Sequence, residues 1–368
     1  MNSRIIFVLV AFAFLVGISY FTAKIYSVGF RFNGQTTKFT FLAFLLIPLL
    51  FVASMVVTRS VSWGIGPVMY TAIQIIAGTG LYIFFGAIVL GIILALGALT
   101  NTLIPTIVPL IIFGLSLLIA ITGLFQARTI VVTNYEVSLP NAPTSWDGKQ
   151  AILVTDTHFG FVNAGDFSDK VVDKILSINP DFVLHAGDFY DGPSIDTAPI
   201  TTSWKRLTEV LPVFYTPGNH EGYGTYEAFI KSTRDANITV LDDKKVEYDG
   251  VQIAGITYRD GKESAEATAA IEGLGFDANK ASILINHPPT SLPAAHNNGV
   301  SLMVSGHTHN GQFWPLNYVT RAVYGAFSYG LNTYKNVQVL TSRGVGTFGP
   351  PFRTFNQSEL VLITFKTT

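Results

Sequence analysis

Residues 60–127 form an uninterrupted run of 68 residues without one charged side chain. A helix in water needs a polar face, so a run of this length is typical of helices surrounded by lipid. It is also far longer than the roughly 20 residues that cross a bilayer once. The polar stretch Thr100-Asn101-Thr102, with Pro105 behind it, is the natural break. We therefore expect two membrane helices, near Val68–Leu99 and Ile104–Phe125.

Two more apolar runs, Ile5–Thr22 and Phe39–Val57, precede this stretch and are each near the length of one bilayer crossing. Arg4 followed by an apolar run also fits a secretory signal peptide. Three further apolar runs and the absence of an obvious small-residue cleavage site favour a membrane helix instead. Residues 1–128 are thus expected to form an all-α transmembrane region of about four helices.

The sidedness of this multi-pass membrane protein follows weakly from its basic residues. Four spans place Arg4, Arg59 and Arg128 on one side and Lys24, Arg31 and Lys38 on the other, which is a tie under the positive-inside rule. An even number of spans puts the N-terminus and the C-terminal domain on the same side of the cell membrane. We take the cytoplasmic side as the working expectation.

Charge divides the chain at Arg128. Residues 1–128 hold six bases and no acid, which leaves 17 of the 23 bases and all 24 acids in residues 129–368, a net charge of −7. A nucleic-acid-binding groove needs a basic surface, so no nucleic-acid partner is expected. The chain has no cysteine, which excludes disulfides, thiolate metal sites and cysteine nucleophiles.

After a turn-rich connector at Asn141–Gly148, the pattern changes to short β-rich runs with intervening helices. Five of these runs end just before polar motifs, and they are Ala151–Thr155, Phe182–Ala186, Val213–Thr216, Ile283–Ile285 and Val300–Val304. Ligands of α/β sheets gather at the carboxyl ends of strands, so the five motifs can meet at one site.

The remaining periodic segments predict the layers around these strands. Helices are expected at Phe167–Ile178 and Tyr226–Ala236. A second sheet is expected to include the later runs Val246–Tyr248, Val251–Ile256, Val337–Thr341 and Leu360–Phe365. The fold class is therefore α/β, with two packed sheets and helices outside. The domains are expected at 1–128 (transmembrane), 129–148 (linker and first strand) and 149–368.

The five motifs contain side chains that bind divalent metals. They read Asp156-Thr-His158, Gly187-Asp188, Gly218-Asn219-His220-Glu221, Asn286-His287 and Gly306-His307-Thr-His309. Five of the seven histidines of the chain lie within them. Imidazole and carboxylate groups bind Mn, Fe, Zn or Ni, and a pair of such ions can clamp a phosphoryl group.

In kind and order these motifs resemble the calcineurin-like metallophosphoesterase family, whose pattern is DxH, GD, GNH[DE], H and GHxH. The segments Gly306–Pro315 and Ser342–Pro351 further resemble a subgroup of membrane-attached bacterial phosphohydrolases with several N-terminal spans. That subgroup usually has glycine where this chain has Asn310. The resemblance implies a two-sheet metallophosphoesterase sandwich over roughly residues 129–368.

The resemblance implies a site for two divalent cations. One ion would be held by Asp156, His158 and His309, and the other by Asn219, His287 and His307, while Asp188 bridges both. A hydroxide formed from a water between the ions would attack the phosphorus atom. His220 would donate a proton or hydrogen bond to the leaving oxygen. Asp191 stands where some members have a carboxylate that orients this histidine. Glu221 follows His220 in the family pattern, and it is either a hydrogen-bond acceptor near the site or a structural residue.

Several other residues have two readings each. Arg343 and Arg353 could bind a substrate phosphate through their guanidinium groups, or could steady a surface loop. His185 and His296 lie outside the motifs and are expected to be structural. The aromatic run around Trp314, which continues through Tyr318, Val319, Val323, Tyr324, Phe327 and Tyr329, could cover the core or rest on the bilayer beside the site.

Together these features predict a membrane-anchored, metal-dependent phosphoesterase. Its substrate would be a phosphorylated small molecule or lipid with a phosphomonoester, phosphodiester or pyrophosphate bond, and a lipid-linked substrate suits the anchor. The alternative is a membrane receptor or scaffold whose esterase domain binds a phospho-ligand without turnover. Transport is disfavoured, because the expected spans hold no ionisable side chain of the kind that marks ion pathways. The sequence does not indicate the oligomeric state.

Overall fold

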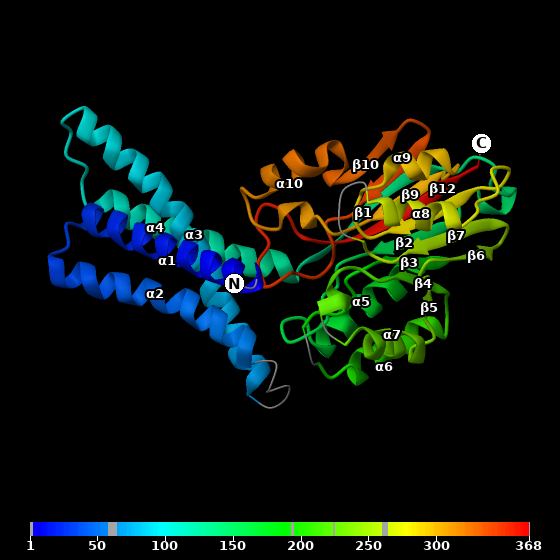
Figure 1. The fold of residues 1–368 in the computed structure, drawn as a ribbon, viewed down its shortest axis with the longest axis horizontal. Coiled ribbons are helices and arrows are strands. Elements are labelled where there is room, and N and C mark those ends of the chain that lie inside the picture. Colours follow the sequence, from blue (N-terminus) through cyan, green and yellow to red (C-terminus); the bar gives the residue numbers. More distant parts are fainter. Residues whose placement is uncertain (1–2, 58–64, 193–194, 224, 260–263, 368) are drawn as a thin grey trace. The chain divides into compact units, whose positions relative to one another are not determined.

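The computed structural model describes residues 3–57, 65–192, 195–223, 225–259 and 264–367 (Figure 1). Arg59, used above to consider sidedness, lies outside these residues. The chain separates into two compact units. Unit 1 comprises residues 1–125 and 349–354, and unit 2 comprises residues 126–348 and 355–368.

Four long apolar helices make up most of unit 1. They are α1 (Ser3–Phe30), α2 (Gly34–Val57), α3 (Gly66–Leu99) and α4 (Ile107–Arg128), the last of which ends in unit 2. Each is long and apolar enough to cross a membrane. The predicted break after Leu99 is confirmed, whereas the fourth helix begins three residues later than expected. Pro105 precedes it, and its carbonyl accepts a turn hydrogen bond from the Val108 N–H.

A short segment from late in the sequence, Gly349–Thr354, packs into unit 1. The Thr354 and Tyr82 hydroxyl oxygens lie 2.6 Å apart, and the Arg353 N–H donates to the carbonyl of Gly123 on α4 at 3.0 Å. A Cβ atom at Gly78 of α3 would collide with the ring of Phe352. The absence of a side chain at Gly78 therefore allows the segment to approach the helix closely.

Unit 2 contains two six-stranded sheets. The first has the order β1-β12-β2-β3-β4-β5. Its strands are β1 (Ile130–Ser138), β2 (Gln150–Val154), β3 (Phe182–Ala186), β4 (Val213–Thr216), β5 (Thr239–Val240) and β12 (Ser358–Lys366). The prediction that Leu360–Phe365 belongs to the second sheet is wrong. Strand β12 instead pairs in parallel with β1 and antiparallel with β2.

The second sheet has the order β10-β11-β9-β8-β7-β6. Its strands are β6 (Lys244–Tyr248), β7 (Val251–Ile256), β8 (Ser282–Asn286), β9 (Leu302–Ser305), β10 (Gly330–Tyr334) and β11 (Val337–Thr341). The other three late runs are therefore correctly assigned to this sheet. Strands β7, β8, β9 and β11 run parallel.

The two sheets pack face to face, as expected, with helices on their outer faces (Figure 1). Leu153 and Leu184 of the first sheet share a buried core with Ile283 and Leu302 of the second. Helices α5 (Gly165–Ile178), α6 (Ala198–Thr208) and α7 (Tyr226–Asp235) cover the first sheet, and α8 (Ala265–Gly273) and α9 (Leu292–Asn297) cover the second. A further short helix, α10 (Asn317–Tyr324), follows β9.

Candidate metal centre

The five motifs lie at the carboxyl ends of parallel strands in the two sheets. Strands β2, β3 and β4 are parallel neighbours in the first sheet, and β8 and β9 are parallel neighbours in the second. Backbone hydrogen bonds join the loops that follow them. The Asp156 N–H donates to Gly187 O at 3.0 Å, and the Gly306 N–H donates to His287 O at 2.9 Å. The two sheets thus bring residues as far apart in the sequence as Asp156 and His309 into one site.

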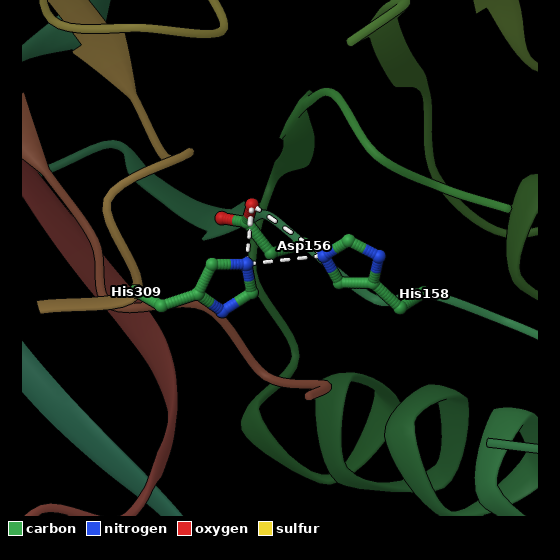
Figure 2. Close-up of side chains that lie close together, drawn as sticks. All are labelled: Asp156, His158 and His309. Carbon is green, nitrogen blue, oxygen red and sulfur yellow. Dashed lines mark hydrogen bonds and ion pairs between the residues drawn. The ribbon is translucent and has the colours of Figure 1, made fainter. Parts of the chain in front are cut away.

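Asp156, His158 and His309 form a first ligand cluster (Figure 2), and His158 also belongs to a group with Asp191 and His220. The Nε2 atoms of the two histidines lie 3.1 Å apart. Oδ1 of Asp156 lies 3.3 Å from Nε2 of His309 and 3.9 Å from Nε2 of His158. All three side chains direct one ligand atom to the same point.

Asp188, His287 and His307 form the second cluster. Nε2 of His287 lies 3.1 Å from Oδ2 of Asp188 and 3.3 Å from Nδ1 of His307. Asn219 joins them, because its Oδ1 atom lies 3.0 Å from Nδ1 of His307. This cluster contains the ligands that the sequence predicts for the second ion.

Asp188 lies between the two clusters. Its Oδ2 atom is 3.1 Å from His287 in one cluster and 3.7 Å from Nε2 of His158 in the other. Its Oδ1 atom accepts a hydrogen bond from the His220 N–H at 2.9 Å, which fixes the orientation of the carboxylate. The position matches that of a bridging ligand.

The donor atoms fit divalent cations. Ligands about 2.1 Å from a tetrahedral zinc-sized ion lie about 3.4 Å from one another, and the spacings within both clusters are close to this. In addition, Nδ1 of His287 lies 2.7 Å from the carbonyl of Ala186. A ring that donates from Nδ1 presents the Nε2 lone pair to a metal, and such outer hydrogen bonds accompany most metal-binding histidines.

Many of these residues adopt a backbone conformation that is costly for side chains other than glycine. The φ angles are +52° at Asp156, +45° at His158, +53° at Asp188, +68° at His307 and +48° at His309. Left-handed conformations at non-glycine residues concentrate in functional sites, where the surrounding structure maintains them. Here the hydrogen bonds between adjacent loops supply that support.

The glycines of the motifs allow the carboxylates to approach the backbone closely. A Cβ atom at Gly218 would collide with Oδ1 of Asp188, and one at Gly306 would collide with Oδ2 of Asp156. Both glycines therefore belong to the metal centre for a steric reason, although neither has a ligand atom on a side chain.

Burial and neighbouring charges set the protonation states of the candidate ligands. Burial lowers the pKa of His158 to about 4 and that of His307 to about 3, so both rings are neutral at pH 7. Burial acts against ionisation of Asp188, but the charge of His287 holds its pKa well below the usual value. Burial likewise opposes protonation of His287, but Asp188 raises its pKa to about 9. A metal ion would replace the proton that this pair shares.

His220 lies beside the ligands and contacts Asp191. Its Nδ1 atom is 2.9 Å from Oδ1 of Asp191, and its ring centroid is 4.5 Å from that of His158. Burial would lower the pKa of His220, but the hydrogen bond to Asp191 raises it to about 9. Glu221 accepts the N–H groups of Gly218 at 2.7 Å and Tyr190 at 2.9 Å, so it supports the loop that presents His220.

Phe348 lies over the histidines and was not identified from the sequence. Its ring centroid is 5.2 Å from that of His220, 6.1 Å from that of His158 and 6.5 Å from that of His309. Its backbone is held at two points, since its N–H donates to Gln312 Oε1 and its carbonyl accepts from Gln312 Nε2. About half of Phe348 is exposed (52%). A phenylalanine in a glycine-rich segment has no sequence signal that separates this role from core packing.

The two candidate phosphate-binding arginines occupy different surroundings. Arg343 forms an ion pair with the fully buried Glu359 at 3.2 Å and lies 5.3 Å from the ring centroid of Tyr329. Glu359 also accepts hydrogen bonds from Thr133, Tyr329 and Ser342. Arg353 is fully buried and belongs to unit 1. Phosphate binding by either residue stays a prediction.

The two histidines outside the motifs have contacts that are typical of structural residues. His185 is fully buried among the rings of Phe189, Trp204 and Tyr215, and burial lowers its pKa to about 3. His296 contacts the side-chain oxygen of Asn336.

Part of the chain is similar to a known protein family. Residues 150–311 match the family model of the calcineurin-like phosphoesterases. An uncharacterised metallophosphoesterase of Campylobacter jejuni is 28% identical over 70% of this chain and 70% of its own length. A transmembrane protein with a metallophosphoesterase domain from Danio rerio is 26% identical over 67% of this chain and 60% of its own. A solved dimetal phosphatase from Danio rerio matches 53% of this chain and 87% of its own at 11% identity, with a TM-score of 0.30.

The matched region contains all five motifs completely. The long apolar helices precede it, and a relative is also named as a transmembrane protein. Residues 150–311 of this chain therefore match the calcineurin-like phosphoesterase family, and they follow four helices that are long and apolar enough to cross a membrane.

Proposed function

We propose that this protein hydrolyses a phosphoester or pyrophosphate bond at a centre of two divalent metal ions. The observation that supports this most directly is the position of Asp188 between two clusters of ligand atoms. Asp156, His158 and His309 would hold one ion, and Asn219, His287 and His307 the other. Two bound ions would polarise the phosphoryl group and activate a water molecule for in-line attack.

The other residues of the site bind and orient the reacting groups. Asp191 holds the His220 ring by the 2.9 Å contact at Nδ1, and the ring would donate a hydrogen bond or proton to the leaving oxygen through Nε2. The ring of Phe348 packs against that of His220 and would line the site beside the leaving group. His220 is thus the proposed catalytic residue, and Asp191 is a positioning residue.

The proposed domain organisation follows the chain. Residues 1–128 anchor the protein by four spans, residues 129–148 contain a linker and the first strand, and residues 149–368 form the catalytic domain. With four spans, the N-terminus and the catalytic domain lie on the same side of the membrane, taken as the cytoplasmic side. An anchored site suits a substrate in or beside the bilayer, such as a lipid phosphate ester or a lipid-linked pyrophosphate.

Hydrolysis of bis(p-nitrophenyl) phosphate tests the proposed activity. Purified full-length protein with added Mn²⁺ is compared with Asp188→Asn and with Asp173→Asn, which removes a carboxylate exposed on α5. We expect turnover by the wild type and Asp173→Asn but not by Asp188→Asn. Metal analysis should show close to two ions per chain only in the two active proteins.

Two other outcomes distinguish the alternatives. If the wild type binds two metals but hydrolyses neither this diester nor a panel of monoesters and lipid pyrophosphates, the receptor or scaffold reading replaces the enzymatic one. If it binds no divalent metal, both the proposed centre and its chemistry are wrong.

A further inference from the structure

Helix α10 is amphipathic, but its apolar side is exposed instead of packing on the core. Four polar or phenolic side chains lie on one side of it, and they are Asn317, Thr320, Arg321 and Tyr324. The other side is formed by Tyr318, Val319, Ala322 and Val323. This apolar side is exposed, with 64% of Tyr318, 57% of Val319 and 45% of Val323 accessible. None of the eight residues of α10, all of which the structure describes, is buried.

Tyr324, at the end of α10, is directed towards the metal centre. The ring centroid of Tyr324 lies 6.1 Å from that of His307, one of the ligands of the second cluster. Three residues before the helix begins, Trp314 extends the exposed apolar surface and contacts Phe355, which is 70% exposed. The sequence left open whether this aromatic segment covers the core. The exposure of α10 argues against that interpretation for the helix, whereas Phe327, which follows it, packs against the core of the second sheet.

The charge of the surrounding sequence indicates what the apolar side contacts. Unit 2 has more acids than bases, yet no acidic residue occurs between Asp277 and Glu359. Five basic residues lie in that stretch. Lys280 and Arg343 form ion pairs and Arg353 is buried, whereas Arg321 on α10 itself is exposed. The membrane-spanning part of the chain shows the same pattern of bases without acids. An apolar face with tyrosine, tryptophan and a basic residue at its border is complementary to the surface of an anionic bilayer.

We propose that the apolar side of α10, together with Trp314 and Phe355, docks on the surface of the bilayer in which the same chain is anchored. Tyr318, Val319 and Val323 enter the interface, while Arg321 contacts lipid phosphates. A helix is about 10–12 Å in diameter, so Tyr324 on the opposite side then lies roughly one helix diameter from the lipid, with the His307 ring 6.1 Å beyond it. The docking itself does not depend on the activity, whereas its consequence, access to lipid phosphates, rests on the proposed function.

Because the chain contains no cysteine, a single introduced cysteine can carry a spin label. Val319→Cys is labelled in the full-length protein and reconstituted into nanodiscs that contain anionic lipid. Val210→Cys is the matched control, since Val210 is also an exposed valine of unit 2 (67%) but follows α6. Collision of the label with oxygen, which concentrates in lipid, is compared with collision with a water-soluble nickel chelate.

We expect the ratio of oxygen to nickel accessibility to be several-fold higher at position 319 than at position 210. Equal ratios at the two positions would show that α10 faces water and would overturn the proposal. Spin–spin broadening at position 319 that disappears on dilution with unlabelled protein would assign the surface to a second copy instead. A label that neither reagent reaches would mean that protein covers the helix, and it would equally overturn the proposal. Each of these readings is independent of catalysis.

Discussion

Nδ1 of His220 lies 2.9 Å from Oδ1 of Asp191, and the second oxygen of the same aspartate lies 3.8 Å from Nδ1 of His158. One carboxylate therefore positions the proposed catalytic histidine and also lies close to a metal ligand. If Asp191 acts through His220, the effects of removing the two residues should not add.

Replacing Asp191 by asparagine should lower kcat by about 10–100-fold, the usual effect of losing a carboxylate that orients a histidine. His220→Ala should cost about 10²–10⁴-fold, as expected for a lost proton donor. The double variant should be no slower than His220→Ala alone, because Asp191 has nothing left to orient. Steady-state kinetics of the three variants checks this, and a fully additive loss would show that Asp191 acts elsewhere.

Gly218→Ala should damage the metal centre through a single methyl group. The added Cβ would collide with Oδ1 of Asp188, whereas a Cβ at Gly222, four residues later, meets nothing within 4 Å. We expect Gly218→Ala to reduce kcat/KM by at least about 100-fold, since small misplacements of reacting groups have effects of this size. Gly222→Ala should stay close to the wild type. Equal activities of the two variants would contradict the steric account of the Gly-Asn-His motif.

Removal of metal should destabilise unit 2 as well as abolish turnover. The paired histidine nitrogens of the two clusters lie 3.1 and 3.3 Å apart, an arrangement that a cation stabilises. An ion at 100 times its Kd stabilises the folded state by about 2.7 kcal/mol. Calorimetry in detergent should therefore show a lower Tm after chelation and recovery with Mn²⁺. His287→Ala should show a smaller change on chelation, and an unchanged wild-type Tm would argue against a metal centre.

The ion pair between Arg259 and Asp243 predicts a local dependence of stability on pH. The hydrogen bond from Arg259 outweighs burial and holds the pKa of Asp243 below its usual value. A carboxylate with a lowered pKa in the folded state adds stability above its unfolded pKa of about 3.9, and this stability is lost as the pH falls through the folded value. The pair is partly exposed, so Asp243→Asn should cost less than about 1 kcal/mol at pH 7.

Denaturant melts at pH 7 and pH 3 test this prediction. The difference between Asp243→Asn and the wild type should be smaller at pH 3 than at pH 7, because the carboxyl group of the unfolded chain is mostly protonated at pH 3. Glu209→Gln, at the end of α6, serves as the control and should show little change at either pH. A cost that is equally large at pH 3 would mean that the side chain acts by packing rather than charge.

Val319→Glu tests the consequence of bilayer docking for substrate access. A carboxylate on the apolar side of α10 should weaken contact with anionic lipid. Hydrolysis of a phosphate ester displayed on vesicles should fall several-fold, whereas hydrolysis of a soluble nitrophenyl diester should not change. Val210→Glu should affect neither reaction. Loss of both activities in Val319→Glu would indicate damage to the site rather than lost docking.

The sequence predicted the parts of the fold that local pattern determines. Apolar runs placed the four long helices, and the position of each motif after a β-rich run placed Asp156, Asp188 and His287 at strand ends. It did not predict that Leu360–Phe365 pairs with β1 and β2, because a buried apolar strand has no local feature that selects its partner. The contact of Phe348 with the histidines has the same cause, since it depends on residues far away in the sequence.

The candidate site was predictable to the extent that its chemistry is unusual. Histidines and carboxylates in fixed order identify a metal centre, and the geometry brings the expected ligands together in two clusters. The roles of Gly218 and Glu359 were not visible, because one acts by having no side chain and the other by accepting hydrogen bonds from three separate segments. Such roles emerge only when the distant parts of the chain are in place.

The packing of Gly349–Thr354 among the helices of unit 1 has a practical consequence. The chain passes from one unit to the other after Phe125, again after Phe348, and once more after Thr354. The two units are therefore not consecutive segments of the chain. A cut near residue 128 separates residues 349–354 from the rest of unit 1, so neither fragment contains one complete unit alone. A truncated, water-soluble version would retain Phe352 and Arg353 without Gly78, Tyr82 and Gly123 to receive them.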